Sequence, residues 1–387
     1  MGEYFSSMKR PFAPLREFLA RESASGILLI AAAALGMVIA NSPARSAYRS
    51  ILDSGFTIDT QYFYLSLSVL KIINYILMSL FFFIVGTEIK RELFQGHLST
   101  VKKAAAPFFA ALGGMAIPAL IYLAVAGDNP SGWAIPVATD IALAVGVVTL
   151  AGSRISLALK SFLLALAVID DIGAIVIIAI FYSAGVGVTW IIFAAITLTL
   201  IYLFRKFGYT SRLITTFAAI VIWYCLYRGG IHPTLAGVAL GLALPVSEKL
   251  EAKLHPLTSF IIVPLFAFAN TGITISTDSL STAINSTLAL GIFLGLVLGK
   301  PLGILLISSL TSFLGIAELP PRRGRTSLIA TGSAAGIGFT VAIFIAMLAF
   351  PDAERQGIAI VAIIAASIVS AVLSLALFRA APVNAND

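Results

Sequence analysis

Long apolar runs separated by short polar segments make up most of this chain. Runs without Asp, Glu, Lys or Arg that are long enough to span a bilayer occupy 23–44, 104–127, 254–277, 279–299, 326–351 and 356–378. A helix needs about 20 residues to cross the hydrocarbon core of a membrane. The alternating pattern of a membrane β-barrel is absent. The pattern therefore predicts an all-α polytopic membrane protein.

Shorter or singly interrupted runs raise the predicted number of transmembrane helices to about twelve. The predicted spans are 16–41, 62–88, 104–126, 133–151, 158–182, 189–205, 212–227, 230–246, 256–275, 290–313, 326–350 and 357–379. The segments between them are too short for a separate soluble domain.

Two of these spans are interrupted at corresponding places. Pro136 and the polar pair Thr139-Asp140 interrupt the fourth span, and the glycine-rich segment 330–344 weakens the eleventh. Either interruption alone indicates a packing feature, because small residues permit close helix contacts in membranes. As a pair, each in the second helix of a triplet, they indicate the substrate site of a transporter.

We accordingly divide the chain into two kinds of unit. Residues 104–182 (spans three to five) and 290–387 (spans ten to twelve) are predicted to form a core of inverted repeats with two discontinuous crossing helices. Residues 1–103 (spans one and two) and 183–289 (spans six to nine) are predicted to form an interface or panel domain. Within the loop 51-ILDSGFTID-59, the turn residues Asp53-Ser54-Gly55 predict a small outer β-hairpin, with an irregular loop as the alternative.

Composition excludes a soluble protein. Hydrophobic residues make up 59% of the chain and charged residues 11%, whereas a globular domain carries about 25% charged residues. Most Lys and Arg lie on the side of the N-terminus, so both termini are predicted to be cytoplasmic. This bias explains the net charge of +7 without a nucleic-acid partner. The single Cys225 excludes an internal disulfide.

Four ionisable residues lie deep within predicted spans: Asp140, Asp170, Asp171 and Lys300. Each costs about 2.5–3.5 kcal/mol at the centre of a membrane helix, so together they cost on the order of 10 kcal/mol, comparable with the stability of a whole domain. The single positive charge of the lysine cannot balance the negative charges of three aspartates. The surplus negative charge requires a mobile cation, for which protons and a metal ion are the candidates.

Asp170 and Asp171 are adjacent but point in different directions. Successive residues of a helix are about 100° apart, so one carboxylate can bind a cation while the other pairs with Lys300. A proton and a small hard cation then compete for the same site, which produces exchange when access alternates. Asp140 is suited to offset the positive N-termini of broken helices and Lys300 their negative C-termini. Thr139 and freed carbonyl groups offer neutral oxygen ligands for a hard cation.

Several motifs resemble the NhaA family of bacterial sodium/proton antiporters over almost the whole chain. They are 134-AIPVATDIALAVGV-147, 164-LALAVIDDIGAIVIIAIFY-182, 228-RGGIHPTLAG-237, 263-VPLFAFANTGI-273, 298-LGKPLGI-304 and 336-GIGFTVAIFIA-346. The resemblance implies that Asp171 is the principal ligand of the cation and that Asp170 is the partner of Lys300. It also implies that Thr139 and Asp140 belong to the broken fourth helix.

The same resemblance implies electrogenic exchange of cytoplasmic Na⁺ or Li⁺ for external H⁺ in a bacterial inner membrane. It further implies regulation by pH and a homodimer joined by the outer β-hairpin. The residues that match its pH-response region are Glu88, Lys90, Arg91, Glu92, His232, Glu251 and His255. Ala252 stands where a second histidine occurs in the best-known members, which puts the details of the pH response in question. No cofactor is implied.

An enzyme and a sodium-coupled symporter are the two other functions to compare with the sequence. A membrane prenyltransferase would need DDxxD, but position 174 is Ala, and an intramembrane aspartyl protease would need GxGD, which does not occur. An enzyme is therefore not expected. A sodium-coupled symporter on the same fold remains the alternative, although it would need a large cavity for an organic substrate.

Overall fold

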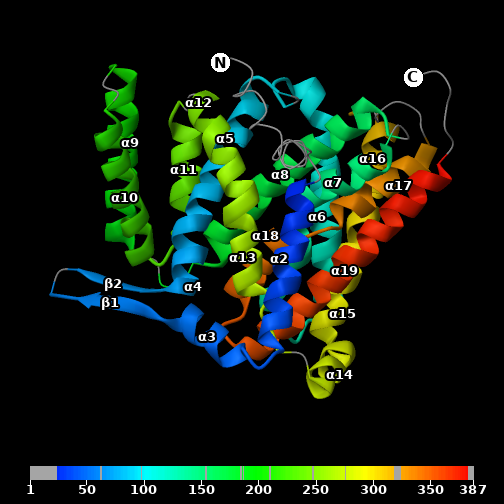
Figure 1. The fold of residues 1–387 in the computed structure, drawn as a ribbon. Helices are drawn as coiled ribbons and strands as arrows, with labels where there is room; N and C mark the ends of the chain where they lie inside the picture. The colour runs from blue at the N-terminus through cyan, green and yellow to red at the C-terminus, as the bar shows by residue number, and fades with distance from the viewer. Residues whose placement is uncertain are drawn as a thin grey trace, which may run out of the picture.

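The computed structural model describes residues 24–381 except 62, 97, 153–154, 184, 186, 209–210, 246–247, 275 and 318–323 (Figure 1). Residues 16–23 of the predicted first span lie outside this part of the chain. The fold is helical apart from one two-stranded antiparallel sheet, β1 (Gly55–Asp59) and β2 (Tyr64–Ser68). The C-terminal end of α19 (Ala353–Ala380) lies at the end of the helix bundle opposite the hairpin (Figure 1).

The helices follow the predicted apolar runs. In chain order they are α2 (Ala24–Ala40), α3 (Arg45–Asp53), α4 (Val69–Lys71), α5 (Met78–Phe94), α6 (Val101–Val125), α7 (Ile141–Leu150), α8 (Leu157–Phe181), α9 (Val188–Lys206), α10 (Arg212–Arg228), α11 (Leu235–Ala243), α12 (Glu248–Leu257), α13 (Val263–Asn270), α14 (Thr277–Asn285), α15 (Thr287–Leu294), α16 (Lys300–Phe313), α17 (Gly324–Ala335), α18 (Phe339–Ala349) and α19 (Ala353–Ala380). Turns of π-helix at Ile72–Leu77, Thr258–Ile262 and Gly295–Gly299 join α4 to α5, α12 to α13 and α15 to α16.

Seven helices of the described residues are long and apolar enough to cross a membrane, or up to ten if each bent pair counts as one span. Two of the bent pairs are the predicted interruptions. Pro130–Val137 meets α7 at 41°, and Thr326–Ala335 meets α18 at 48°. Helices α10 and α11 coincide with predicted spans but have only 17 and 9 residues. A multi-pass helical membrane protein is thus established, and the described residues do not confirm the predicted count of twelve spans.

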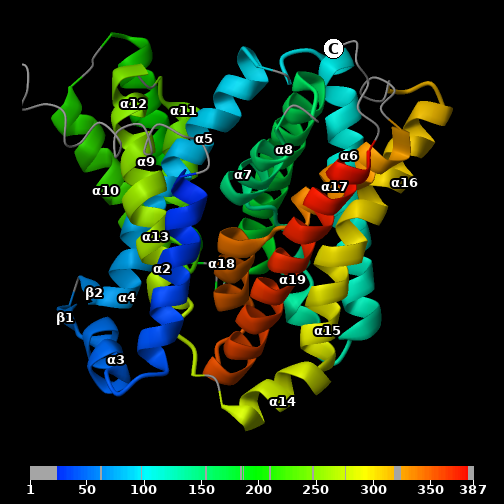
Figure 2. The same cartoon turned by 45° about the vertical axis from the view of Figure 1, so that its right-hand side comes forward.

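The helices gather in two groups, which are separated in the view of Figure 2. One group holds α2, α5 and α9 to α13, and the other holds α6 to α8 and α15 to α19. Within the second group α6 packs closely on α16. The backbones are so near that a Cβ at Gly113 would collide with the carbonyl oxygen of Gly303. Glycine therefore lets two membrane helices approach along their backbones.

An aromatic side chain of α18 joins the two groups. The ring of Phe344 is buried, and its centroid lies 4.9 Å from that of His232, 5.4 Å from that of Phe82 and 6.2 Å from that of Phe266. These three rings belong to the first group of helices. Such edge and tilted contacts contribute about 0.5–1.5 kcal/mol each beyond the area that they bury.

The hairpin exists, but its turn is not at Asp53-Ser54-Gly55 as predicted. Helix α3 continues to Asp53, Gly55 already pairs with Ser68, and the strands are joined by residues 60–63. At that turn the hydroxyl of Thr60 accepts a hydrogen bond from the backbone N–H of Phe63. The prediction erred because the sequence of the turn, TQYF, lacks Gly, Asn, Asp and Pro, whereas Asp-Ser-Gly marks the exit from a helix.

Candidate functional site

Asp140 links the two interrupted helices. It is the N-cap of α7, where its Oδ1 accepts a hydrogen bond from the N–H of Leu143 at 3.1 Å. Its Oδ2 accepts two more from Thr340 in the first turn of α18, from the N–H at 3.1 Å and from the hydroxyl at 2.6 Å. The backbone N–H of Asp140 donates to the carbonyl oxygen of Ile337 at 2.7 Å. One carboxylate therefore stabilises the positive ends of two helices.

Lys300 and Asp170 form a fully buried ion pair. The Nζ of Lys300 lies 2.5 Å from Oδ2 of Asp170, and neither side chain is exposed. Thr139 completes the cluster, because its hydroxyl accepts a hydrogen bond from Lys300 at 2.9 Å. The same hydroxyl lies 2.8 Å from both Asp170 Oδ2 and the carbonyl oxygen of Ala335, and its single proton serves one of them. Lys300 thereby stands close to the negative C-terminal end of α17.

Asp171 stands apart from this cluster. Its side chain has no hydrogen bond or ion pair among the described residues, and it keeps 9% of its surface exposed, whereas Asp170 is fully buried. The charges of Asp170, Glu88, Asp140 and Lys300 act on it. Oδ1 of Asp170 also has no partner in the described part of the chain. Of the three aspartates in this site, Asp171 is thus the one that no cation or helix end of the described residues neutralises.

The four expected cation-site residues do not converge on one point. Thr139 and Asp170 are bonded to Lys300, Asp140 is bonded to Thr340, and Asp171 is free of both pairs. Within the described residues, no three His, Cys, Asp or Glu side chains lie close enough together to hold a metal ion. The residues that the sequence reasoning missed are Thr340 and the carbonyl groups of Ala335 and Ile337. The segment 336-GIGFT-340 stands out in the sequence through its glycines and its resemblance to the NhaA family, and neither feature indicates a role for Thr340.

Most of the expected pH-response residues gather at the end of the bundle opposite the hairpin. Arg91 Nη1 lies 2.5 Å from Glu251 Oε1, and His255 Nε2 lies 3.7 Å from Glu88 Oε1, so that α5 and α12 are linked twice. Lys90 donates a hydrogen bond to the carbonyl oxygen of Leu244 at the end of α11. Glu92 occupies the last turn of α5. Glu88 is the member of this cluster whose charge also acts on Asp171.

His232 is not part of that cluster. Its ring is buried, with Nδ1 at 2.7 Å from the hydroxyl of Thr234. It packs edge-on against Tyr75 and Phe344, with centroid distances of 4.9 Å to each. The His232 ring is therefore part of the aromatic contact that joins the two helix groups.

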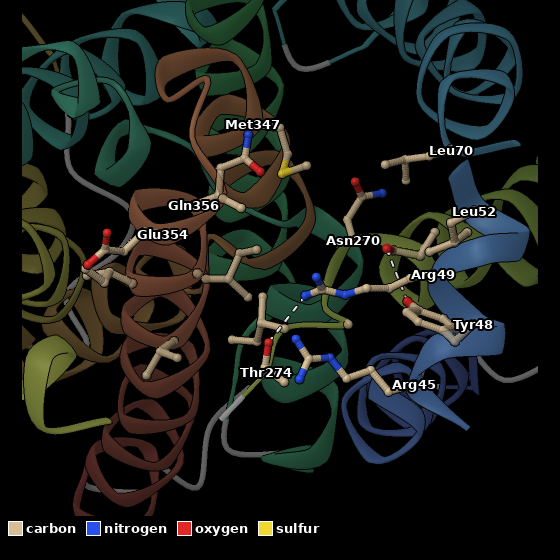
Figure 3. A pocket seen from close by; sticks show the side chains of 18 of the residues that line it. Arg45, Tyr48, Arg49, Leu52, Leu70, Asn270, Thr274, Met347, Glu354 and Gln356 are labelled. Carbon is tan, nitrogen blue, oxygen red and sulfur yellow. Dashed lines mark hydrogen bonds between the residues drawn. The ribbon is translucent and has the colours of Figure 1, made fainter. Parts of the chain in front are cut away.

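A cavity of about 510 Å³ opens between α3, the segment after α13 and the start of α19. Figure 3 shows Arg45 and Arg49 entering it from α3, with Arg49 bonded to Thr274. Met347 lines the cavity, and it lies seven residues after Thr340 on α18. At a rise of 1.5 Å per residue, Met347 lies about 10 Å from Thr340 along the axis of α18.

Comparison with known proteins gives one consistent result. Residues 16–378 match the family model described as Na⁺/H⁺ antiporter 1. A Na(+)/H(+) antiporter NhaA of Shewanella frigidimarina is 45% identical over 347 residues, which cover 87% of this chain and 88% of that protein. A Na(+)/H(+) antiporter NhaA 2 of Myxococcus xanthus is 41% identical, covering 95% and 89%. A Na(+)/H(+) antiporter NhaA of Serratia proteamaculans is 44% identical, covering 88% and 90%.

Proposed function

This chain belongs to the NhaA family of Na⁺/H⁺ antiporters, and we propose that it exchanges cytoplasmic Na⁺ or Li⁺ for external H⁺ at Asp171. The observation that supports this assignment is the balance of charge in the buried site. Asp140 is compensated by two helix N-termini and Asp170 by Lys300. Asp171 has neither a helix N-terminus nor a lysine to compensate it, and a carboxylate in a low-dielectric interior is stable only when a proton or a metal cation neutralises it.

Competition at Asp171 is the step that couples the two ions. A proton or a Na⁺ ion can neutralise this carboxylate, but not both at once. Asp170 precedes it in the chain and has an Oδ1 without a partner among the described residues, and Thr139 is bonded to Asp170, so both are the further oxygen donors of the expected site. Oxygen ligands suit a small hard cation. The role of Asp140 is mainly structural, because its oxygens already accept hydrogen bonds from α7 and α18.

The net charge of the proton-loaded site and that of the Na⁺-loaded site differ by one elementary charge. With Asp171 protonated and Lys300 charged against Asp170, the three side chains sum to zero. When Na⁺ replaces the proton on Asp171 and the Lys300–Asp170 pair also releases a proton, their sum with Na⁺ is −1. Two protons thus enter for each Na⁺ that leaves, so exchange is electrogenic and responds to the membrane potential.

The remaining architecture is proposed on the same basis. Twelve spans, with the interrupted helices crossing at the midplane, would let the core of 104–182 and 290–387 move against the panel of 1–103 and 183–289. The excess of Lys and Arg at the end of the molecule opposite the hairpin supports cytoplasmic termini in a bacterial inner membrane. The Arg91–Glu251 and His255–Glu88 contacts would then face the cytoplasm and respond to its pH.

The hairpin is suited to join two copies into a homodimer. The hydroxyls of Tyr224 and Tyr227 accept hydrogen bonds from the N–H groups of Tyr64 and Ser66, which covers the outer edge of β2. Peptide groups of a strand alternate in direction, so those of Gly55, Thr57 and Asp59 point away from β2. They have no backbone partner within the described residues, and the same edge of a second copy can pair with them about a two-fold axis.

Transport by the purified protein in liposomes tests the function. Adding Na⁺ or Li⁺ to vesicles with an imposed pH gradient should dissipate that gradient without any organic solute. A sodium-coupled symporter would leave the gradient unchanged until its organic substrate is added. A wild-type protein that fails to respond to Na⁺ across pH 6 to 9 would overturn the proposal.

A further inference from the structure

We infer that Thr340 is a positioning residue for exchange: its hydroxyl fixes the Asp140 carboxylate between the N-termini of α7 and α18, and thereby sets the electrostatic field in which Asp171 binds its cation. This inference rests on the function proposed above. It concerns a residue that touches neither the ion nor Asp171 in this geometry.

The contact between Thr340 and Asp140 is reinforced from both sides. The hydroxyl of Thr340 makes the shortest of the hydrogen bonds to Asp140, at 2.6 Å, and its N–H donates to the same oxygen. In return the N–H of Asp140 donates to the carbonyl oxygen of Ile337, three residues before Thr340. Two chain breaks that are 200 residues apart in sequence are thus bonded in both directions.

The glycines around Thr340 allow this approach. A Cβ at Gly338 would lie 3.2 Å from the carbonyl oxygen of Ala138, and one at Gly336 would lie 2.5 Å from that of Leu296. At Gly338 the backbone of the second break can therefore lie against the first break, and at Gly336 it lies against the π-helical turn Gly295–Gly299. Thr340 is then the first side chain of α18 that can reach the carboxylate, and it is 4% exposed.

Asp140 needs this anchor because its charge acts at a distance. It is one of the carboxylates whose charge acts on Asp171, and no lysine, arginine or histidine of the described residues forms an ion pair with it. Without the Thr340 hydroxyl, Oδ2 would keep one hydrogen bond instead of two. The carboxylate could then rotate away from α18, and the field at Asp171 would change without any loss of a ligand.

The test replaces the hydroxyl by a methyl group of nearly the same shape. Thr340→Val in the full-length protein in liposomes should raise the apparent KM for Na⁺ about tenfold, the effect expected for one hydrogen bond to a charged group, while the maximal rate changes less. The pH profile of the apparent KM should shift as well. Thr340→Ser keeps the hydroxyl and should restore both quantities.

Thr331→Val is the matched control. Thr331 is also a buried threonine of the second interrupted span, but its hydroxyl donates only to the carbonyl oxygen of Ser327, within its own helix. This variant should resemble wild type in KM and in pH profile. If Thr340→Val does not assemble in the membrane, Thr340→Ala supports the same comparison, with its melting temperature measured at increasing Na⁺ concentration.

A double-variant cycle separates positioning from packing. In an Asp140→Asn background, Thr340→Val should change the apparent KM by less than twofold, because the charge that it positions is gone. An equal tenfold effect in both backgrounds, or a Thr340→Val protein that matches the Thr331→Val control, would overturn the inference. Failure of the proposed function is a different outcome, since wild type itself would then show no exchange.

Discussion

At the scale of single residues, two neighbouring aspartates have different surroundings because α8 turns them in different directions. Asp170 faces Lys300 and Thr139 in a fully buried cluster. Asp171 faces no partner among the described residues and retains a small exposed surface. The same side chain is therefore held by an ion pair at one position and left available for a mobile cation at the next.

Asp171→Asn is expected to abolish exchange of both Na⁺ and Li⁺. The amide keeps the size of the side chain but removes the charge and the site of protonation together, so neither ion can be coupled to the other. Exchange is measured as dissipation of a pH gradient in liposomes at saturating Na⁺. Substantial residual exchange there would show that another group carries the ion.

Asp140 is expected to tolerate Asn better than Ala. Asn is as good an N-cap as Asp, and its amide oxygen can still accept a hydrogen bond from one of the two helices, whereas Ala leaves both helix N-termini without an acceptor. Asp140→Ala should lower thermal stability by about 1–2 kcal/mol for the lost cap and weaken the apparent affinity for Na⁺, with exchange still measurable. An Asp140→Ala protein as inactive as Asp171→Asn would mean that Asp140 ligates the ion directly.

At the scale of elements, the hairpin and the interrupted helices use backbone groups in opposite ways. The interrupted helices satisfy their freed groups with each other, through Asp140, Ile337 and Thr139. The hairpin satisfies one edge with two tyrosines of α10 and presents the other, and β1 is exposed along its length. An open strand edge is a site for pairing with another chain.

Thr57→Pro should convert the proposed dimer to monomer while exchange remains measurable. The N–H of Thr57 points away from β2, so proline removes a donor of the free edge and leaves the β1–β2 ladder intact. Oligomeric state is measured by crosslinking or native gels. Thr57→Ala keeps the N–H and is the control. A dimer that persists in Thr57→Pro, with the hairpin still folded, would place the interface elsewhere.

At the scale of the whole molecule, Lys300 connects stability to transport. Removing one member of a buried ion pair leaves an uncompensated charge and costs about 3–5 kcal/mol. Lys300→Ala should therefore lower the melting temperature and impair exchange. An Asp170→Asn/Lys300→Gln double variant removes both charges and should recover much of the stability. Lys300→Arg cannot release a proton at physiological pH, so it should move less net charge per cycle.

The measurement pairs thermal unfolding with current recorded on a solid-supported membrane. If Lys300→Ala matches wild type both in melting temperature and in charge moved per cycle, the second proton does not travel on the Lys300–Asp170 pair. The aspartates alone would then have to carry both protons.

Hydropathy alone predicts a multi-pass membrane protein and places Asp140, Asp170, Asp171 and Lys300 in its interior, and all four side chains are buried in the structure. Hydropathy is a sum over neighbouring residues, so it needs no knowledge of the fold. The interruptions at Pro136 and at 330–344 were visible for the same reason. The turn of the hairpin was misplaced, because Asp53-Ser54-Gly55 has the residues of a turn while the actual turn at 60–63 does not.

Which side chains meet depends on the packing of helices that are far apart in the chain. Lys300 and Asp170 are 130 residues apart, and their pairing was expected only from the family resemblance, whereas Asp140 and Thr340 are 200 apart, and no feature of the sequence indicated their contact. Thr340 carries no charge, so its cost in an apolar segment is too small to mark it in the sequence. Its contact with Asp140 exists because two helices break at the same depth and their glycines let the backbones touch, and that is a property of packing.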